Sequence, residues 1–132
     1  MRVADGLVAG AVAGVVSGAP STAHALVSGR RALDAVRAAG TLVGSPTVAA
    51  GAAVHAAVSL GWGAVLGAVV PDRHSVRWGA VAGVVIAAID LGVIGRCFPR
   101  IRALPVLPQV ADHVAYGATV GAVLALSARR SR

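Results

Sequence analysis

One segment of the chain places an acid, an imidazole and a phenol inside an otherwise apolar run. Asp112, His113 and Tyr116 stand close together there. Three more ionisable side chains interrupt other apolar runs, namely His24, His55 and Asp90. A carboxyl group and an imidazole can share a proton, and histidine changes its charge near neutral pH. These six residues are therefore the candidates for handling a proton or a cation.

The surrounding sequence is too apolar for a domain that folds in water. Of its 132 residues, 57% are hydrophobic and 13% are charged, and the mean hydropathy is +0.80. Soluble domains have roughly 45–50% apolar and about 25% charged residues, and a chain of this length suits one domain. The composition predicts a single integral membrane domain, with the lipid bilayer as its first partner.

The net charge of +7 comes from arginines that lie in the gaps between the apolar runs. This pattern is typical of membrane-flanking charge and not of nucleic-acid binding, which needs a basic stripe or a reading motif. The chain has one cysteine, Cys97, which allows neither an intrachain disulfide nor a cysteine-based metal cluster. The sequence contains no motif of hydrolases or nucleotide-binding enzymes, and no enzyme activity is predicted.

The apolar runs predict four membrane-spanning helices, over residues 3–28, 46–70, 78–95 and 108–127. A helix of about 20 apolar residues crosses a hydrocarbon core of ~30 Å. Pro20 is expected to kink the first span, because it lacks a backbone N–H. Residues 30–43 are interpreted as an amphipathic helix in the membrane interface, or alternatively as a solvated helix in a loop.

A secretory signal peptide is the alternative interpretation of the first apolar run. Arg2 precedes that run, and Ala23-His24-Ala25 resembles a cleavage site. Asp5 in the flank disfavours this alternative. So does the recurrence of Gly10–Val16, letter for letter, at residues 79–85.

The same recurrence predicts two similar helical hairpins. A second string, an aromatic residue followed by Gly-Ala-x-x-Gly-Ala-Val, occurs at residues 62–69 and again at 116–123. Each unit holds an even number of spans, so the hairpins are expected to be parallel repeats related by an axis along the membrane normal. Chance recurrence in a chain rich in Ala, Gly and Val is the alternative.

Glycines at four-residue spacing line one face of each predicted helix. Because they lack side chains, they allow a neighbouring helix to approach closely, and such rows drive helix association in lipid. The residues of this predicted glycine zipper are Gly6, Gly10, Gly14, Gly18, Gly63, Gly67, Gly79, Gly83, Gly117 and Gly121. The predicted fold class is therefore all-α, a glycine-packed four-helix transmembrane bundle.

The ionisable residues are expected at a common depth. Counting ~1.5 Å per residue from the span boundaries puts five of them in one leaflet, on the side of the two arginine-rich connectors: His24, His55, Asp90, Asp112 and His113. Intramembrane ionisable groups normally point at neighbouring helices. The sequence therefore predicts one shared polar layer inside the bundle.

Three hypotheses explain this layer. The preferred one is structural: the polar groups make interhelical hydrogen bonds that fix helix register in a structural or interaction component of the membrane. The second is a proton- or cation-coupled transporter or channel, with Asp90 and Asp112 as carriers and His55 and His113 as relays. Divalent metal binding belongs with this second hypothesis. The third is a b-type haem anchor with histidine ligands from two facing helices. Because the structural hypothesis is preferred, no cofactor is predicted.

The arginines do not define the orientation of the bundle in the membrane. One side of the predicted bundle carries Arg2, Arg73, Arg77, Arg129, Arg130 and Arg132, and the other carries Arg30, Arg31, Arg37, Arg96, Arg100 and Arg102. This tie gives the positive-inside rule no basis for a choice, and insertion in both orientations is an alternative. The prediction places the termini in the cytoplasm of a bacterial cell, with the bundle in its inner membrane. It expects a homo-oligomer or a partner membrane protein.

The stretch from Asp112 to Gly121, Asp-His-Val-Ala-Tyr-Gly-Ala-Thr-Val-Gly, resembles the final span of small bacterial inner-membrane proteins of the YagU-like kind. In those proteins a histidine, then an aromatic residue and a glycine, open the last helix. His55, Trp62-Gly63 and Gly67 repeat this order in the second span. The resemblance implies a multi-span protein of the cytoplasmic membrane, and it supplies no substrate and no catalytic residues.

Overall fold

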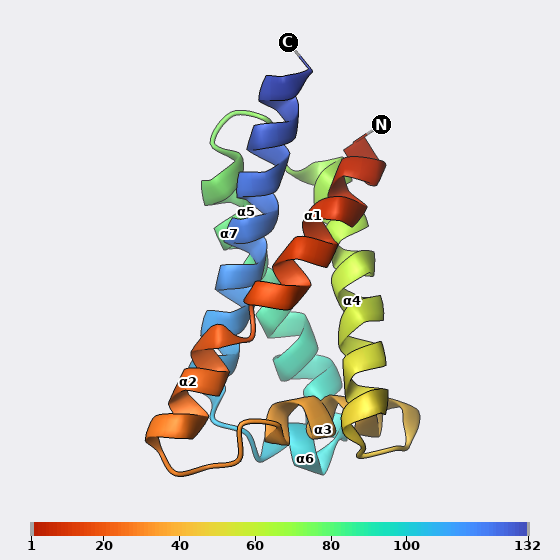
Figure 1. Cartoon of the computed structure of the whole chain (residues 1–132), viewed down its shortest axis with the longest axis vertical. Helices are drawn as coiled ribbons and strands as arrows, with labels where there is room; N and C mark the ends of the chain where they lie inside the picture. The colour runs from red at the N-terminus through yellow and green to blue at the C-terminus, as the bar shows by residue number, and fades with distance from the viewer. Residues whose placement is uncertain (1, 132) are drawn as a thin grey trace.

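The computed structural model describes residues 2–131, and all of its regular elements in that range are helical. Four segments are long and apolar enough to cross a membrane: Arg2–Val27, Val48–Val69, Ser75–Cys97 and Val106–Arg130. Figure 1 shows them running along the long axis of the molecule, with short helices across its lower end. The chain is therefore an all-helical, multi-pass membrane protein.

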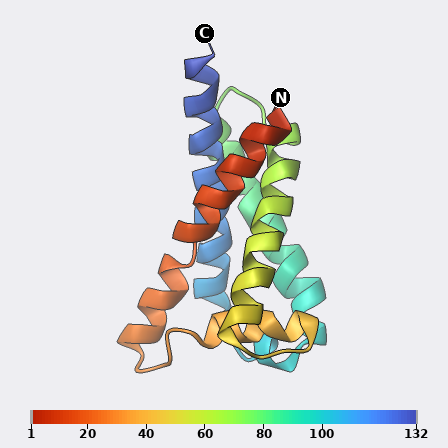
Figure 2. The same ribbon diagram turned by 45° about the vertical axis from the view of Figure 1, so that its right-hand side comes forward.

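The first span consists of two helices. α1 covers Arg2–Val16 and α2 covers Ala19–Val27, with a turn between them. Pro20 is in the first turn of α2, where its missing N–H and fixed φ suit a helix start and would disrupt a helix interior. The expected kink is thus a complete break. Figures 1 and 2 both show α2 diverging from α4 below this break.

The second and fourth spans are continuous helices. α4 covers Val48–Val69, and the Thr47 hydroxyl caps its start by accepting the backbone N–H of Ala50 at 3.2 Å. α7 covers Val106–Arg130, so it begins before and ends after the predicted range 108–127. α4 ends just before Pro71, as expected from a residue that cannot continue a helix.

The third span changes its helical geometry along its length. α5 covers Ser75–Ile89, so it starts earlier than residue 78, the predicted first residue. It continues as a π-helical turn, η2 (Asp90–Ile94), and a 3-10 turn, η3 (Gly95–Cys97). A π turn widens the helix by one residue and is rare outside functional or strained segments. The apolar pattern did not predict this change.

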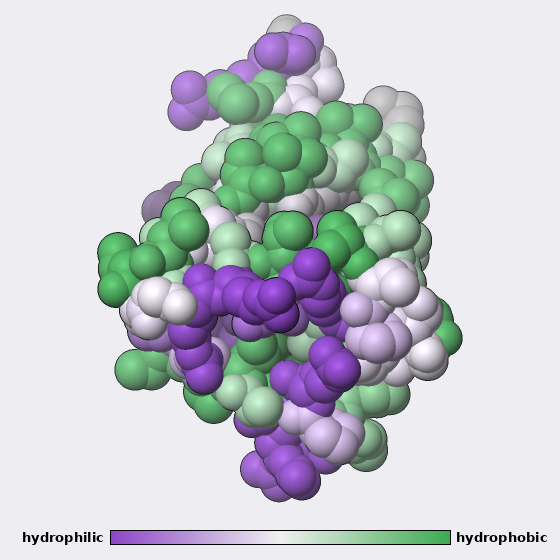
Figure 3. Space-filling model, turned by 60° about the horizontal axis from the view of Figure 1, so that its bottom comes forward, coloured by the Kyte–Doolittle hydropathy of each residue, from purple (hydrophilic) through white to green (hydrophobic). Residues whose placement is uncertain are grey.

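The connectors fold across the lower end of the spans. α3 (Asp34–Gly40), η1 (Thr41–Val43) and α6 (Pro99–Arg102) lie there. The helix predicted over residues 30–43 is therefore correct only in its second part, because the residues before Asp34 form turns. Figure 3 views this end and shows hydrophilic side chains across its middle, between apolar ones.

α3 packs closely on the start of α4. A methyl group added to Gly51 would overlap the backbone carbonyl of Val36, and one added to Gly40 would lie 3.0 Å from the carbonyl oxygen of Thr47. Leu33 and Val43, two large apolar side chains of this connector, are 46% and 63% exposed. The connector is thus held to the bundle by backbone contact at two glycines.

The spans contact one another in the order α4–α1–α7–α5. α1 packs mainly against α4, and α5 packs mainly against α7. One small core joins them, and its buried residues are Ala9, Ala13, Leu66, Val70, Ile86, Tyr116, Val120 and Leu124. Many large apolar side chains instead face outward, Val15 and Leu107 being 85% and 81% exposed. An apolar exterior is what a helix bundle in lipid presents.

The closest helix pairs meet at glycines. A methyl group on Gly6 would lie 2.9 Å from the Cα of Gly67, and one on Gly10 would lie 2.9 Å from the Cα of Gly63. A methyl group on Gly79 would lie 2.9 Å from the carbonyl carbon of Gly117. Backbone atoms at such distances leave no room for a side chain. The neighbours of the remaining positions, Gly14, Gly83 and Gly121, are Ser59, His113 with Val114, and Ser75 with Val76.

Gly18 departs from the predicted packing row. It lies in the turn between α1 and α2, and no atom of another helix is within 4 Å of where its Cβ would be. The break carries Gly18 out of the row that contains Gly6, Gly10 and Gly14. Its assignment to helix packing is therefore wrong.

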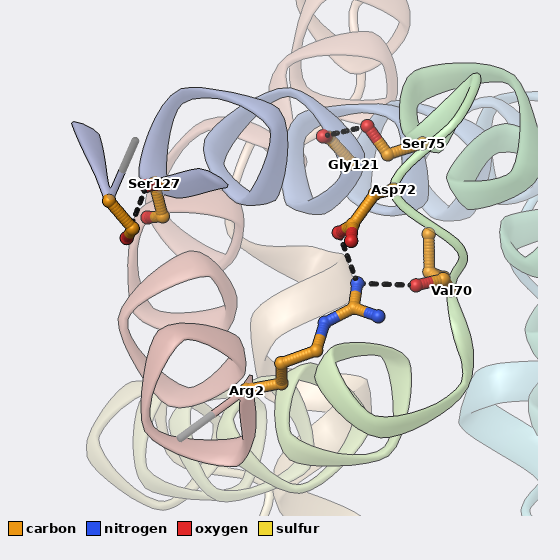
Figure 4. A network of polar contacts seen from close by, with 7 residues as sticks. Arg2, Val70, Asp72, Ser75, Gly121 and Ser127 are labelled. Carbon is orange, nitrogen blue, oxygen red and sulfur yellow. Dashed lines mark hydrogen bonds and ion pairs between the residues drawn. The ribbon is translucent and has the colours of Figure 1, made fainter. Parts of the chain in front are cut away.

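The upper end of the bundle is joined by polar contacts (Figure 4). The Arg2 guanidinium donates to the carbonyl of Val70 at 2.5 Å and pairs with the Asp72 carboxylate at 3.1 Å. The Ser75 hydroxyl donates to the carbonyl of Gly121 at 2.9 Å. These contacts tie the start of α1 to the α4–α5 turn and the start of α5 to α7.

Candidate functional site

The break between α1 and α2 leaves backbone groups without helical partners. The last carbonyls of α1 and the first N–H groups of α2 are such groups, because each helix end has unsatisfied donors or acceptors. In hydrocarbon no water is present to bond them, so neighbouring helices must do so. Two of the predicted site residues bond these groups.

Asp112 bonds the start of α2. Its Oδ1 accepts the backbone N–H of Ser21 at 2.9 Å, and Ser21 is in the first turn of α2. A carboxylate is favourable at this position because it satisfies an orphan donor and faces the positive end of the helix dipole. Asp112 belongs to α7, so one helix supplies the cap of another.

His55 bonds the end of α1. Its Nε2 lies 2.7 Å from the carbonyl oxygen of Gly14, in the last turn of that helix. A carbonyl only accepts hydrogen bonds, so Nε2 carries the proton in this contact. The break is therefore held from both sides, by an imidazole of α4 and a carboxylate of α7.

Tyr116 makes a further contact between α7 and α4. Its side chain is buried in the core, and its hydroxyl donates to the backbone carbonyl of Ser59. Ser59 is itself buried and faces Gly14 of α1. The phenol thus fixes the relative position of three helices around the break.

Asp90 and His113 form a pair. Asp90 opens the π turn η2, and its Oδ2 lies 3.3 Å from Nε2 of His113, with side-chain exposures of 21% and 19%. The other ring nitrogen of His113, Nδ1, lies 2.7 Å from the carbonyl of Gln109 and therefore carries a proton. One further proton between Nε2 and Oδ2 completes the pair, either on the imidazole or on the carboxyl group.

The candidate residues make separate hydrogen bonds. Asp112, His55 and Tyr116 each bond a backbone group on a different helix, and Asp90 pairs with His113. His24 lies apart on α2, where its Nε2 is 3.4 Å from the Ser28 hydroxyl. The shared polar layer expected from counted depths therefore stays a prediction, and its members bond different partners. Depth along a helix says nothing about the direction in which a side chain points.

A metal or a haem finds few ligands in this arrangement. Among residues 2–131, no group of three His, Cys, Asp or Glu side chains is positioned to hold a metal ion. Both ring nitrogens of His113 and Nε2 of His55 already contact protein atoms. Neither His55 nor His113 therefore presents an unengaged Nε2 to a haem iron.

A cavity at the lower end of the bundle was not predicted from the sequence. It has a volume of about 310 Å³ and lies between α2, the segment from Arg30 to Ala38, α6 and the start of α7. Four of its lining residues are arginines, Arg30, Arg31, Arg37 and Arg100, and we call the cavity the basic vestibule after them. These arginines come from two connectors, so only the folded chain brings them together. The signal in the sequence was the arginine content of both connectors, which was interpreted only for orientation.

The basic vestibule adjoins two of the polar contacts. Ser21 and Gln109 line it. The N–H of Ser21 is bonded to Asp112, and the carbonyl of Gln109 is bonded to His113. One hydrogen bond thus links a lining residue of the vestibule to Asp112, and another links a lining residue to His113 of the Asp90–His113 pair.

The polar side chains of the bundle are well satisfied. Across residues 2–131, no buried side-chain nitrogen or oxygen lacks a hydrogen-bond partner.

Comparison of the chain with protein-family models, curated proteins and solved structures gives no match. The YagU-like resemblance therefore stays a prediction, and function must be argued from the geometry of the site.

Proposed function

We propose that this protein is a structural or interaction component of the membrane, and that its intramembrane polar residues serve to hold an irregular bundle in one arrangement. The observation that carries this proposal is the pair of contacts at the α1–α2 break. Asp112 bonds the N–H of Ser21, and His55 bonds the carbonyl of Gly14. A residue used in this way stabilises the fold and is not free to exchange with a substrate.

We also propose that the bundle is a glycine zipper built from two similar hairpins. Corresponding positions of the repeated strings face each other in both pairs: Gly10 faces Gly63, and Gly79 faces Gly117. The first span of each hairpin also leaves α-helical geometry after the shared Gly-Ala-Val-Ala-Gly-Val-Val string, the second time at Asp90. A duplicated hairpin explains both likenesses.

The proposed location is the inner membrane of a bacterium, with cytoplasmic termini, and the proposed partner is a second copy or another membrane protein. The outer face of α4 supports the partner. Ala53, Ala57 and Gly61 are exposed there at four-residue spacing, which is a spacing that allows close helix–helix contact in lipid. Crosslinking in native membranes through a cysteine placed at Ala57 tests this partner. A Cys97→Ser background is needed, because Cys97 is free and exposed.

The structural role is tested by separating stability from transport. The purified protein and its Asp112→Asn and His55→Gln variants are reconstituted into vesicles, and proton flux and bundle unfolding are both measured. A structural role predicts easier unfolding of both variants with no difference in flux. A wild-type proton flux that either variant abolishes, with unfolding unchanged, would contradict the proposal.

A proton-handling function at Asp90 and His113 is the second candidate. These two side chains share one proton across 3.3 Å, and His113 is bonded to a residue that lines the basic vestibule. Intramembrane acid–histidine pairs form proton relays in transporters. This candidate predicts a pH-dependent flux that Asp90→Asn abolishes and Asp112→Asn leaves intact. An Asp90→Asn variant that carries the wild-type flux would exclude it.

A further inference from the structure

Few acidic side chains are present to neutralise the four arginines of the basic vestibule. Asp34 is the one acidic residue of its lining, and its carboxylate lies 3.9 Å from the Arg37 guanidinium. Within the described part of the chain, Arg30, Arg31 and Arg100 make no ion pair, whereas Arg2 at the opposite end pairs with Asp72. Like charges that line one cavity repel each other, and a bound anion removes that repulsion.

Arginine is the residue that suits a phosphate group best. Its planar guanidinium offers several N–H donors that match two phosphate oxygens at once, and it stays charged at every accessible pH. His24 also lines the basic vestibule, and its imidazole ring offers a further N–H donor there. Four arginines around one cavity therefore indicate an anion with several oxygen acceptors, more than a single halide ion.

The rest of the lining is aliphatic. Ala25, Ala35, Leu104 and Pro105 contribute to the wall between the arginines and the spans. A volume of about 310 Å³ lies at the lower end of the roughly 300–1,000 Å³ range of small-molecule sites. A cavity that combines cationic and aliphatic walls fits a phosphate group attached to an aliphatic portion.

The basic vestibule also lies where phosphate is present in a bilayer. α3 and α6 cross the lower ends of the apolar spans (Figures 1 and 2), and hydrophilic side chains cover the middle of that face (Figure 3). The headgroup region begins where the apolar spans end. Basic pockets between membrane helices at this level bind anionic lipid headgroups.

We propose that the basic vestibule binds a phosphate group, with Arg30, Arg31, Arg37 and Arg100 as its ligands. The phosphate of an anionic phospholipid and free inorganic phosphate offer the same chemistry. The aliphatic wall gives the phospholipid an additional contact. This site goes beyond the structural role proposed above and does not depend on it.

The test measures binding of phosphatidylglycerol, phosphatidylcholine and inorganic phosphate to the purified full-length protein in detergent. Native mass spectrometry counts bound lipid, and calorimetry measures inorganic phosphate. Arg31→Gln and Arg100→Gln should each weaken binding of phosphatidylglycerol about fivefold, and together about 25-fold, since each basic residue contributes ~1 kcal/mol to such contacts. Arg102→Gln is the matched control, because Arg102 is on the same short helix and does not line the basic vestibule.

Two arms distinguish the sources of the phosphate. If inorganic phosphate displaces phosphatidylglycerol, the site takes free phosphate as well. If only the lipid binds, the site is a lipid site, and both results support the proposal. Equal affinities for the two lipids without phosphate binding would overturn it, as would an Arg102→Gln loss equal to that of Arg100→Gln. Circular dichroism checks the fold of each variant, and Arg31→Gln, in the exposed segment between α2 and α3, serves if Arg100→Gln does not fold.

Discussion

Replacing Asp112 by alanine tests the account of the broken first span most directly. The change removes the acceptor that holds the Ser21 N–H at 2.9 Å and leaves that donor unbonded at a helix break. Removing a side-chain cap costs about 0.5–2 kcal/mol in soluble proteins, whereas interhelical hydrogen bonds in membranes average about 0.6 kcal/mol. The acceptor here is a carboxylate at the positive end of a helix, so we expect a loss of about 1–2 kcal/mol.

Two measurements report this loss. Reversible unfolding in mixed micelles, followed by circular dichroism, gives the free energy of unfolding of the whole bundle. Hydrogen exchange of the Ser21 amide reports the contact itself, and it should become about 5–30-fold faster if the amide opens together with the start of α2. Asp112→Asn keeps a carbonyl acceptor without the charge, so its effect should be intermediate.

The control for this prediction is Leu107→Ala. Leu107 is on the same helix as Asp112 and is 81% exposed, so its truncation should change stability by less than about 0.5 kcal/mol. The reasoning is refuted if Asp112→Ala unfolds like the wild type and the exchange of the Ser21 amide is unaltered. A loss of stability without faster Ser21 exchange would also contradict it, because the effect would then arise elsewhere.

Three further predictions concern single positions. Gly63→Leu should lower the free energy of unfolding by about 1–3 kcal/mol, because the leucine side chain would collide with the backbone of α1. Gly61→Leu, on the same helix, meets open space and should change the free energy of unfolding little. Tyr116→Phe should cost about 1 kcal/mol in the same unfolding assay, since it deletes the hydroxyl bonded to the Ser59 carbonyl. His74→Gly should raise the midpoint of thermal unfolding. His74 has a φ of 59°, and a left-handed conformation costs a non-glycine residue ~1–2 kcal/mol. A lower midpoint of the variant would refute this prediction.

The sequence alone was sufficient to predict the four membrane-spanning segments. Hydrophobicity and length are properties of each segment by itself, and a segment of about 20 apolar residues has few stable states other than a transmembrane helix. Proline positions marked the helix ends near Pro71 and the irregularity near Pro20 for the same reason, because the missing N–H acts locally. Segment ends shifted where a helix extended past its apolar run, as α7 does at both ends.

The roles of the polar residues could not be obtained in this way. Counting along the spans placed His55 and Asp112 in the same leaflet and led to the expectation of one shared layer. Their partners, the carbonyl of Gly14 and the N–H of Ser21, exist as unbonded groups only because the first span breaks. Whether an imidazole meets a backbone carbonyl or another side chain depends on the rotation of two helices, which no single segment encodes.

The basic vestibule shows the same division between local and non-local information. The sequence determined that both connectors are rich in arginine and that they lie on one side of the membrane. Only the tertiary structure decided that Arg31 and Arg100 line one cavity, because this depends on how α2 diverges after the break and on where α3 and α6 settle. Hydrophobic content sets which segments enter the bilayer, whereas the packing of small residues against distant backbone sets which polar groups meet.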